Sequence, residues 1–129
     1  TEFEKASLVE YARHTLRNEL TQIKLNLKYI LPIYSNSYHS NKIACFVSIN
    51  NKIYDNIDAK QRGCLGTIDN KNQSLLKNVR YFSIQSGIHD TRYSPITYNE
   101  LLKENKNNNN IVRYDFNMDF SVSILNKKK

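Results

Sequence analysis

Glycine, proline, cysteine and tryptophan are scarce in this chain, whose 129 residues include 3 Gly, 2 Pro, 2 Cys and no Trp. This composition excludes collagen-like and low-complexity disordered chains, because 40% of the residues are hydrophobic and can form an interior. Two cysteines, Cys45 and Cys64, are too few for a disulfide framework and lack the paired spacing of a zinc site. We therefore expect no metal, no cofactor and a reducing, intracellular location in the cytoplasm or the nucleus.

Long hydrophobic runs are absent as well. The longest candidate, Ile43 to Ile49, is far shorter than the roughly 20 residues of a membrane-spanning helix. The length fits one domain, because domains commonly contain about 100–150 residues. We therefore expect a single globular domain over residues 1–129 that does not associate with a membrane.

The chain is strongly basic, with 19 Lys+Arg against 12 Asp+Glu and a net charge of +7. Three of these charges belong to the terminal Lys127, Lys128 and Lys129, and most other lysines are scattered singly among asparagines. No stripe of arginines with interleaved aromatic residues is present, although such stripes are typical of nucleic-acid-binding faces. The pattern disfavours nucleic acid as the partner without excluding it.

The first half of the chain reads as a helix followed by two strands. Apolar residues spaced three and four apart predict an amphipathic helix from Phe3 to about Lys24, and they are Val9, Ala12, Leu16, Leu20 and Ile23. A polar stretch after Pro32 predicts a loop. The β-branched and aromatic run from Ile43 to Ile49 predicts a buried strand, and a second strand from Gln61 to Ile68 would pair with it antiparallel.

The second half reads as helix, loop, short helix and strand. Ser74 is the expected N-cap of a helix that ends at Gly87 in a left-handed cap. Thr97 opens a capping box for a short helix, and residues 103–110 are an Asn-rich, mobile insertion. A half-buried strand covers Phe120 to Ile124. This order predicts an α+β fold with an antiparallel sheet packed against helices.

The segment Arg62-Gly63-Cys64-Leu65-Gly66 holds two of the three glycines in the chain. Such placement indicates either a bulge in the strand or another group that closely approaches its backbone. In a functional interpretation Cys64 is a nucleophile or ligand contact, and Arg62 orients a carboxylate or phosphate. In a structural interpretation Cys64 is a small buried thiol and Arg62 forms an ion pair that holds the fold.

The segment 61–67 resembles the L-R-G-C-I-G signature of the AMMECR family, with Gln61 and Leu65 in place of Leu and Ile. Three further blocks resemble family segments in the same order. They are Ala44 to Ile49, Asp90 to Thr97 with its D-x-R-F-x-P-[IV]-T pattern, and Ser121 to Leu125. Family members continue well beyond the last of these strands, so we expect that this chain lacks their C-terminal segment.

The resemblance implies an α+β fold of two subdomains with the signature near a cleft, but it implies no particular reaction. It points to a binding site that includes five residues, namely Arg62, Gly63, Gly66, Asp90 and Arg92. The chain is thus expected to be a binding or regulatory module for an unidentified protein partner or a small anionic ligand. The alternative is an enzyme that uses Cys64 as its catalytic nucleophile.

Two contacts between these residues can be stated as hypotheses. Arg62 and Asp90 would meet across the cleft, as a structural ion pair or as part of a ligand site. His89 is the only histidine near a motif and is therefore the candidate base of a catalytic dyad with Cys64. Such a dyad requires His89 to lie within hydrogen-bond reach of Cys64.

Overall fold

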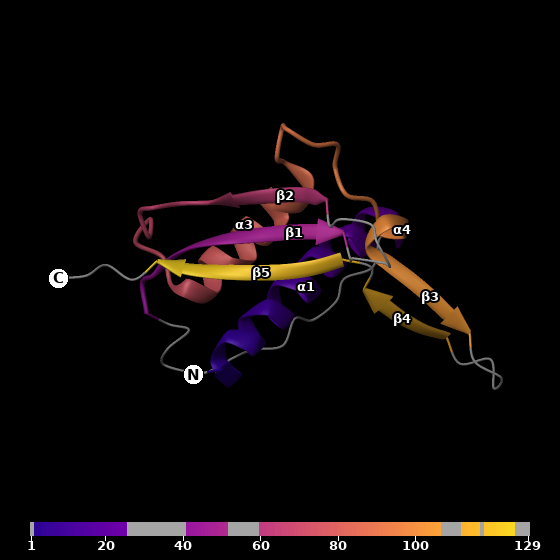
Figure 1. Ribbon diagram of the computed structural model, residues 1–129, viewed down its shortest axis with the longest axis horizontal. Coiled ribbons are helices and arrows are strands. Elements are labelled where there is room, and N and C mark those ends of the chain that lie inside the picture. Colours follow the sequence, from indigo (N-terminus) through magenta and orange to yellow (C-terminus); the bar gives the residue numbers. More distant parts are fainter. Residues whose placement is uncertain (1, 26–40, 52–59, 107–111, 117, 126–129) are drawn as a thin grey trace.

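The structure is a computed structural model of the whole chain. It describes residues 2–25, 41–51, 60–106, 112–116 and 118–125. The expected loop after Pro32, the asparagines 107–110 and the terminal lysines lie outside these residues. Figure 1 shows a sheet with two helices behind it and a smaller strand pair to one side.

The main sheet contains three strands in the order β2-β1-β5, and both pairs are antiparallel. The strands are β1 (Ala44–Asn51), β2 (Gln61–Gly66) and β5 (Met118–Leu125). The expected antiparallel α+β arrangement is therefore confirmed. The second strand is shorter than expected, because it ends at Gly66 and leaves Ile68 with 81% of its surface exposed.

Helices α1 (Glu2–Leu25) and α3 (Leu75–Ile88) pack against one face of the sheet and against each other. The helical spacing of apolar residues in α1 places Leu8, Ala12, Leu16 and Leu20 in the core. Ile23 departs from the expected face, because 67% of its surface is exposed at the end of the helix.

Helix α3 begins as the sequence predicts and ends differently. The Ser74 hydroxyl accepts a hydrogen bond from the Lys77 amide, as expected of an N-cap. The expected left-handed cap at Gly87 is wrong, since no glycine has a positive φ and the helix continues to Ile88. Gly87 has a packing role instead, because a Cβ there would lie 2.7 Å from a methyl carbon of Leu16.

The short helix α4 (Tyr98–Leu101) begins at Thr97, whose hydroxyl accepts from the Glu100 amide as the capping box predicts. Strand β3 (Leu102–Lys106) follows at once and pairs antiparallel with β4 (Val112–Phe116). The expected insertion over residues 103–110 therefore begins with a strand and is not a loop from its start.

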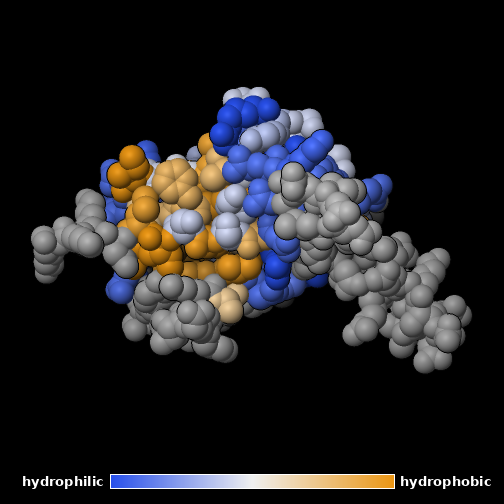
Figure 2. Space-filling view, viewed as in Figure 1, coloured by the Kyte–Doolittle hydropathy of each residue, from blue (hydrophilic) through white to orange (hydrophobic). Residues whose placement is uncertain are grey.

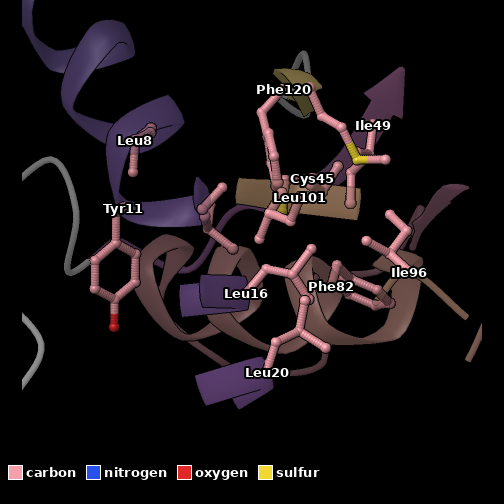
Figure 3. Close-up of a cluster of buried hydrophobic side chains, with 14 of the residues drawn as sticks. Leu8, Tyr11, Leu16, Leu20, Cys45, Ile49, Phe82, Ile96, Leu101 and Phe120 are labelled. Carbon is pink, nitrogen blue, oxygen red and sulfur yellow. The ribbon is translucent and has the colours of Figure 1, made fainter. Parts of the chain in front are cut away.

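The hydrophobic core lies between the sheet and the two helices. Figure 3 shows side chains from α1, α3, α4 and the sheet meeting in one cluster, including Leu16, Phe82, Ile49, Ile96 and Leu101. Ile96 and Leu101 bring the loop after α3 and helix α4 into the same core. This packing fixes the loop 89–97 beside strand β2.

Candidate functional site

The signature residues form β2, and a bulge redirects the first of them. Ile49 of β1 faces Gly63 while Asn50 faces Gln61, so Arg62 is the extra residue of a β-bulge. Its side chain reaches helix α4, where Nε and Nη2 donate to the Glu100 carboxylate at 2.6 and 2.9 Å. These hydrogen bonds raise the pKa of Arg62 and keep it protonated.

The two glycines of β2 allow close contacts on opposite faces of the strand. A Cβ on Gly63 would lie 1.9 Å from the carbonyl oxygen of Ser86, so the backbone of α3 rests directly on this residue. A Cβ on Gly66 would lie 2.3 Å from the Cys45 carbonyl oxygen and would also meet Phe46. The bulge and the close approach that the glycine spacing predicts therefore both occur in this strand.

Ser86 joins α3 to two strands at once. Its hydroxyl donates to the Val47 carbonyl of β1 at 2.8 Å and accepts from the Leu65 amide of β2 at 2.9 Å. Val47 and Leu65 face each other in the sheet register. The hydroxyl thus serves as donor and acceptor between the two strands, and Ser86 is fully buried there.

Asp90 and Arg92 bind the outward-facing backbone groups of Cys64. The Cys64 amide donates to Asp90 Oδ2 at 3.0 Å, and Arg92 Nη2 donates to the Cys64 carbonyl at 2.8 Å. Arg92 also donates to Asp90 through Nε at 3.0 Å and Nη2 at 2.8 Å. We call this arrangement of Asp90, Arg92 and the Cys64 backbone the edge clamp.

The electrostatics of the edge clamp favour the charged forms of both side chains. Hydrogen bonds from Arg92, assisted by the backbone amide of Cys64, hold the pKa of the buried Asp90 carboxyl well below its usual range. The same contact with Asp90 raises the pKa of Arg92. The clamp is therefore an ion pair across the physiological pH range.

Arg92 is oriented by the clamp and is still open to solvent. Its side chain is 57% exposed, and its guanidinium carbon lies 5.3 Å from the centre of the Tyr93 ring. Among the described residues, its Nη1 has no hydrogen-bond partner. One edge of a fixed guanidinium is thus available as a hydrogen-bond donor.

The hypothesis that Arg62 pairs with Asp90 is wrong. Arg62 binds Glu100 and the Ser94 carbonyl, while Asp90 binds Arg92 and two backbone amides. From the sequence, Asp90 was the expected partner of Arg62, and Glu100 was expected only in the capping box of the short helix. The signature instead makes two separate contacts. The Cys64 backbone binds the loop 89–97, and the Arg62 side chain binds α4.

The Cys64 side chain lies on the face of the sheet opposite α3, because its neighbour Gly63 faces the helix. It is partly exposed and reduced. Within the described part of the chain, no hydrogen bond joins its thiol to His89, which is itself exposed. The arrangement needed for the hypothetical dyad is therefore not present in these residues.

An apolar pocket of about 340 Å³ lies on the other side of the loop 89–97. It is lined by residues from the ends of α1 and α3 and from the start of α4, namely Leu20, Ile23, Ile88, Pro95, Ile96, Thr97, Tyr98 and Asn99. The exposed Ile23 therefore belongs to its rim. Sequence reasoning placed Ile23 in the core and missed this pocket.

Sequence reasoning also missed Ser86, Ser94 and the second role of Glu100. The only signal for Glu100 was its place in the capping box, which indicated a helix start and no contact with Arg62. Among the described residues, none of the helices is long and apolar enough to cross a membrane. The same residues contain no group of three or more His, Cys, Asp or Glu side chains that could hold a metal ion.

Comparisons with known proteins give a family match and a similar solved fold. A family model described as AMMECR1 matches residues 9–105, which include the signature, all of α4 and all but the last residue of β3. The crystal structure of the uncharacterized protein PH0010 from Pyrococcus horikoshii has a similar fold, with a TM-score of 0.67 and 21% sequence identity. The similarity covers 93% of this chain and 50% of that one, so the chain spans about half of that relative. None of the curated proteins matches this chain.

Proposed function

The chain belongs to the AMMECR1 family, and from this premise we propose that it is a binding module that recognises an acidic group of a protein partner at the loop 89–97. The observation that carries the proposal is the fixed, half-exposed guanidinium of Arg92 in the edge clamp. A donor that is already oriented loses little conformational entropy on binding, so a single hydrogen bond from it contributes more to the binding free energy.

The charge of the whole chain supports an acidic partner. Asp90 balances the charge of Arg92 locally, so this contact would depend on directed hydrogen bonds from Nη1. The net charge of +7 would supply the longer-range attraction that brings an acidic partner to the site.

The apolar pocket supports a protein as the partner. Exposed apolar residues around a concave surface are typical of protein interaction sites, and Ile23 has this character. The same loop contributes Arg92 to one side and Pro95 and Ile96 to the pocket. A partner segment with one acidic and one apolar side chain would fit this combination.

The roles expected of the other signature residues follow from their contacts. Arg62, Gly63, Gly66 and Asp90 would position the loop and Arg92, and would not touch the partner themselves. The proposal does not use Cys64 as a nucleophile. An intracellular location remains part of the proposal, since Cys45 and Cys64 are free thiols that suit a reducing compartment.

The test is an NMR titration of the full chain with inorganic phosphate and with free glutamate as simple anionic probes. We expect shifts at the Arg92 side-chain Nε–H and at the Cys64 amide, with half-saturation on the order of 1 mM. Arg92→Gln removes the Nε–H reporter itself and should abolish the shift at the Cys64 amide. Arg80→Gln is the matched control, because Arg80 is an exposed arginine on α3 outside the clamp.

Equal responses from the Arg92→Gln and Arg80→Gln variants would contradict the proposal. Saturation by phosphate without any response to glutamate would indicate a small anionic ligand in place of a protein carboxylate.

A further inference from the structure

A second pocket, of about 260 Å³, lies beside the start of helix α3. It is lined by the loop before this helix and by the first half of the helix itself, with the residues Lys71, Gln73, Asn78, Tyr81 and Phe82. Asn78 is only 1% exposed, so its side-chain amide is shielded from bulk water. All the lining residues belong to one continuous described segment, and the pocket is therefore formed without either end of the chain.

The nitrogen of the Asn78 amide is fully used inside the protein. Its Nδ2 donates to the carbonyl oxygens of Ile43 at 2.8 Å, Asn70 at 3.1 Å and Gln73 at 3.3 Å. These three acceptors fix which end of the amide is the nitrogen, because an oxygen in its place would face three other oxygens. The amide thus joins the loop before α3 to the residue that precedes β1.

The oxygen of the same amide has no hydrogen-bond partner among the described residues. A buried acceptor that is left unsatisfied is unfavourable, and native proteins rarely contain one. Because Nδ2 is directed at the loop and at Ile43, Oδ1 lies on the other side of the amide. Tyr81 and Phe82, three and four positions further along the helix, share this face of α3 with Asn78. The pocket therefore offers an acceptor that lacks a donor.

The lining restricts the chemistry of a ligand. An acceptor disfavours carboxylates and phosphates, and Lys71, the one charged residue of the lining, disfavours a cation. A neutral donor remains. An amide or a hydroxyl would bring an acceptor of its own, which the occupied Nδ2 could not satisfy. A ring N–H is a donor only, so it matches the single free atom of Asn78.

The other walls of the pocket are aromatic. The rings of Tyr81 and Phe82 meet edge to face with their centres 5.0 Å apart, and Tyr81 is 54% exposed. Such rings bind flat aromatic molecules in offset or edge-to-face contacts. A cavity of about 150 Å³ holds benzene, so this larger pocket has room for two fused rings. A single water would leave most of this volume empty.

We propose that this pocket, the Asn78 pocket, binds a small neutral aromatic heterocycle of the indole type. The ring N–H donates to Asn78 Oδ1, and the fused rings contact Tyr81 and Phe82. Figure 1 shows the loop between β2 and α3 at the left of the molecule and the loop after α3 at its top. The two sites lie at opposite ends of α3, about 15 Å apart along its axis. The proposal is therefore independent of the function proposed for the loop 89–97.

An NMR titration of the full chain with indole and with benzofuran tests the proposal. Benzofuran has nearly the same shape, but a ring oxygen replaces the N–H. We expect indole to shift the Asn78 side-chain NH₂ signals and the backbone amides of Lys71 and Tyr81, with half-saturation at about 0.1–1 mM. Benzofuran should bind at least about tenfold more weakly, because it places a second acceptor against Oδ1.

The probe is varied in place of Asn78, because a substitution of this residue would also release the three carbonyls that Nδ2 holds. Tyr81→Ala removes the exposed ring and should weaken the binding of indole about fivefold. Ile68→Ala is the matched control. Ile68 is an exposed apolar residue outside the lining, so this variant should bind indole as the wild type does.

N-acetyltryptophanamide carries the same ring on a peptide-like backbone and should bind more weakly than indole, because the rings alone fill the pocket. Tighter binding of this probe would overturn the proposal of a free ligand in favour of a tryptophan from a partner protein. Equal affinity for indole and benzofuran would also overturn it, as would indole shifts that are absent near Asn78 or confined to the apolar pocket beside Pro95.

Discussion

At the scale of single residues, the signature is explained by the close contacts that each of its residues permits or makes. Gly63 admits the backbone of α3, and Gly66 leaves room for the ring of Phe46. The Cys64 amide and carbonyl are held by side chains 26 and 28 positions further along the chain. The cysteine thus contributes to the fold through its peptide groups, whatever its thiol does.

The charge of Asp90 should make the stability of the protein depend on pH. Its folded-state pKa lies below the value of about 3.9 in unfolded chains, so its contribution is complete above that value and is lost as pH falls toward the folded pKa. Chemical denaturation should show a falling free energy of unfolding between about pH 5 and pH 2.

Asp90→Asn should lower the free energy of unfolding by about 1–3 kcal/mol at pH 7, and the difference from wild type should shrink as the pH falls. Asp119→Asn, at an exposed position of β5, should follow the wild-type curve. A difference between Asp90→Asn and wild type that is constant down to pH 2 would contradict this account.

At the scale of elements, the sequence predicts most of the helices and strands and misses one strand pair. Helices α1 and α3 and strands β1 and β5 follow from apolar periodicity and caps, which are local properties of the chain. Strand β3 lies in a segment rich in Lys and Asn, whose β-propensity is low, so only its pairing with β4 reveals it.

The contacts between elements could not be predicted in the same way. Asp90 was the expected partner of Arg62, and the bulge that turns Arg62 toward Glu100 depends on the register between β1 and β2. The role of Ser86 likewise depends on where α3 crosses the sheet. Local sequence specifies the elements, whereas these partners are specified by packing at long sequence separation.

Ser86→Ala should measure how strongly α3 is joined to the sheet. The change leaves the Val47 carbonyl and the Leu65 amide without the hydroxyl that binds both, and the expected cost is about 1–3 kcal/mol in urea unfolding. Ser83→Ala is the matched control on the same helix. Its hydroxyl binds only the Val79 carbonyl one turn earlier, so its loss should cost less than about 1 kcal/mol. Equal costs for the two variants would show that the bridge to the strands is unimportant.

At the scale of the whole molecule, one face of the sheet is covered by helices and the other is open in the described residues. Figure 2 shows hydrophobic atoms gathered over the open face, where Phe46, Ile68 and Leu125 contribute exposed surface. The two cysteines lie on opposite faces of this sheet. Cys45 faces the core and is fully buried, whereas Cys64 faces outward.

The two thiols should therefore report different events in alkylation by iodoacetamide. Burial raises the pKa of the Cys45 thiol to about 12, so at pH 8 it is neither charged nor accessible in the folded protein. In native buffer, mass spectrometry should show one modified thiol, that of Cys64. In a Cys64→Ala variant, the modification of Cys45 should be slow and should accelerate with urea in parallel with global unfolding.

Full denaturant is the internal control, since both thiols should then react at similar rates. Fast native labelling of Cys45 in the Cys64→Ala variant would contradict the buried position of Cys45.

The edge clamp also has a consequence for the time course of folding. It connects β2 to a loop that comes after α3, and it does so through side chains, so it can close only when both elements are already in place. We therefore expect the clamp to form after the folding transition state. Asp90 and Arg92 should then slow unfolding while leaving the folding rate unchanged, which makes the clamp a determinant of how long each molecule stays folded.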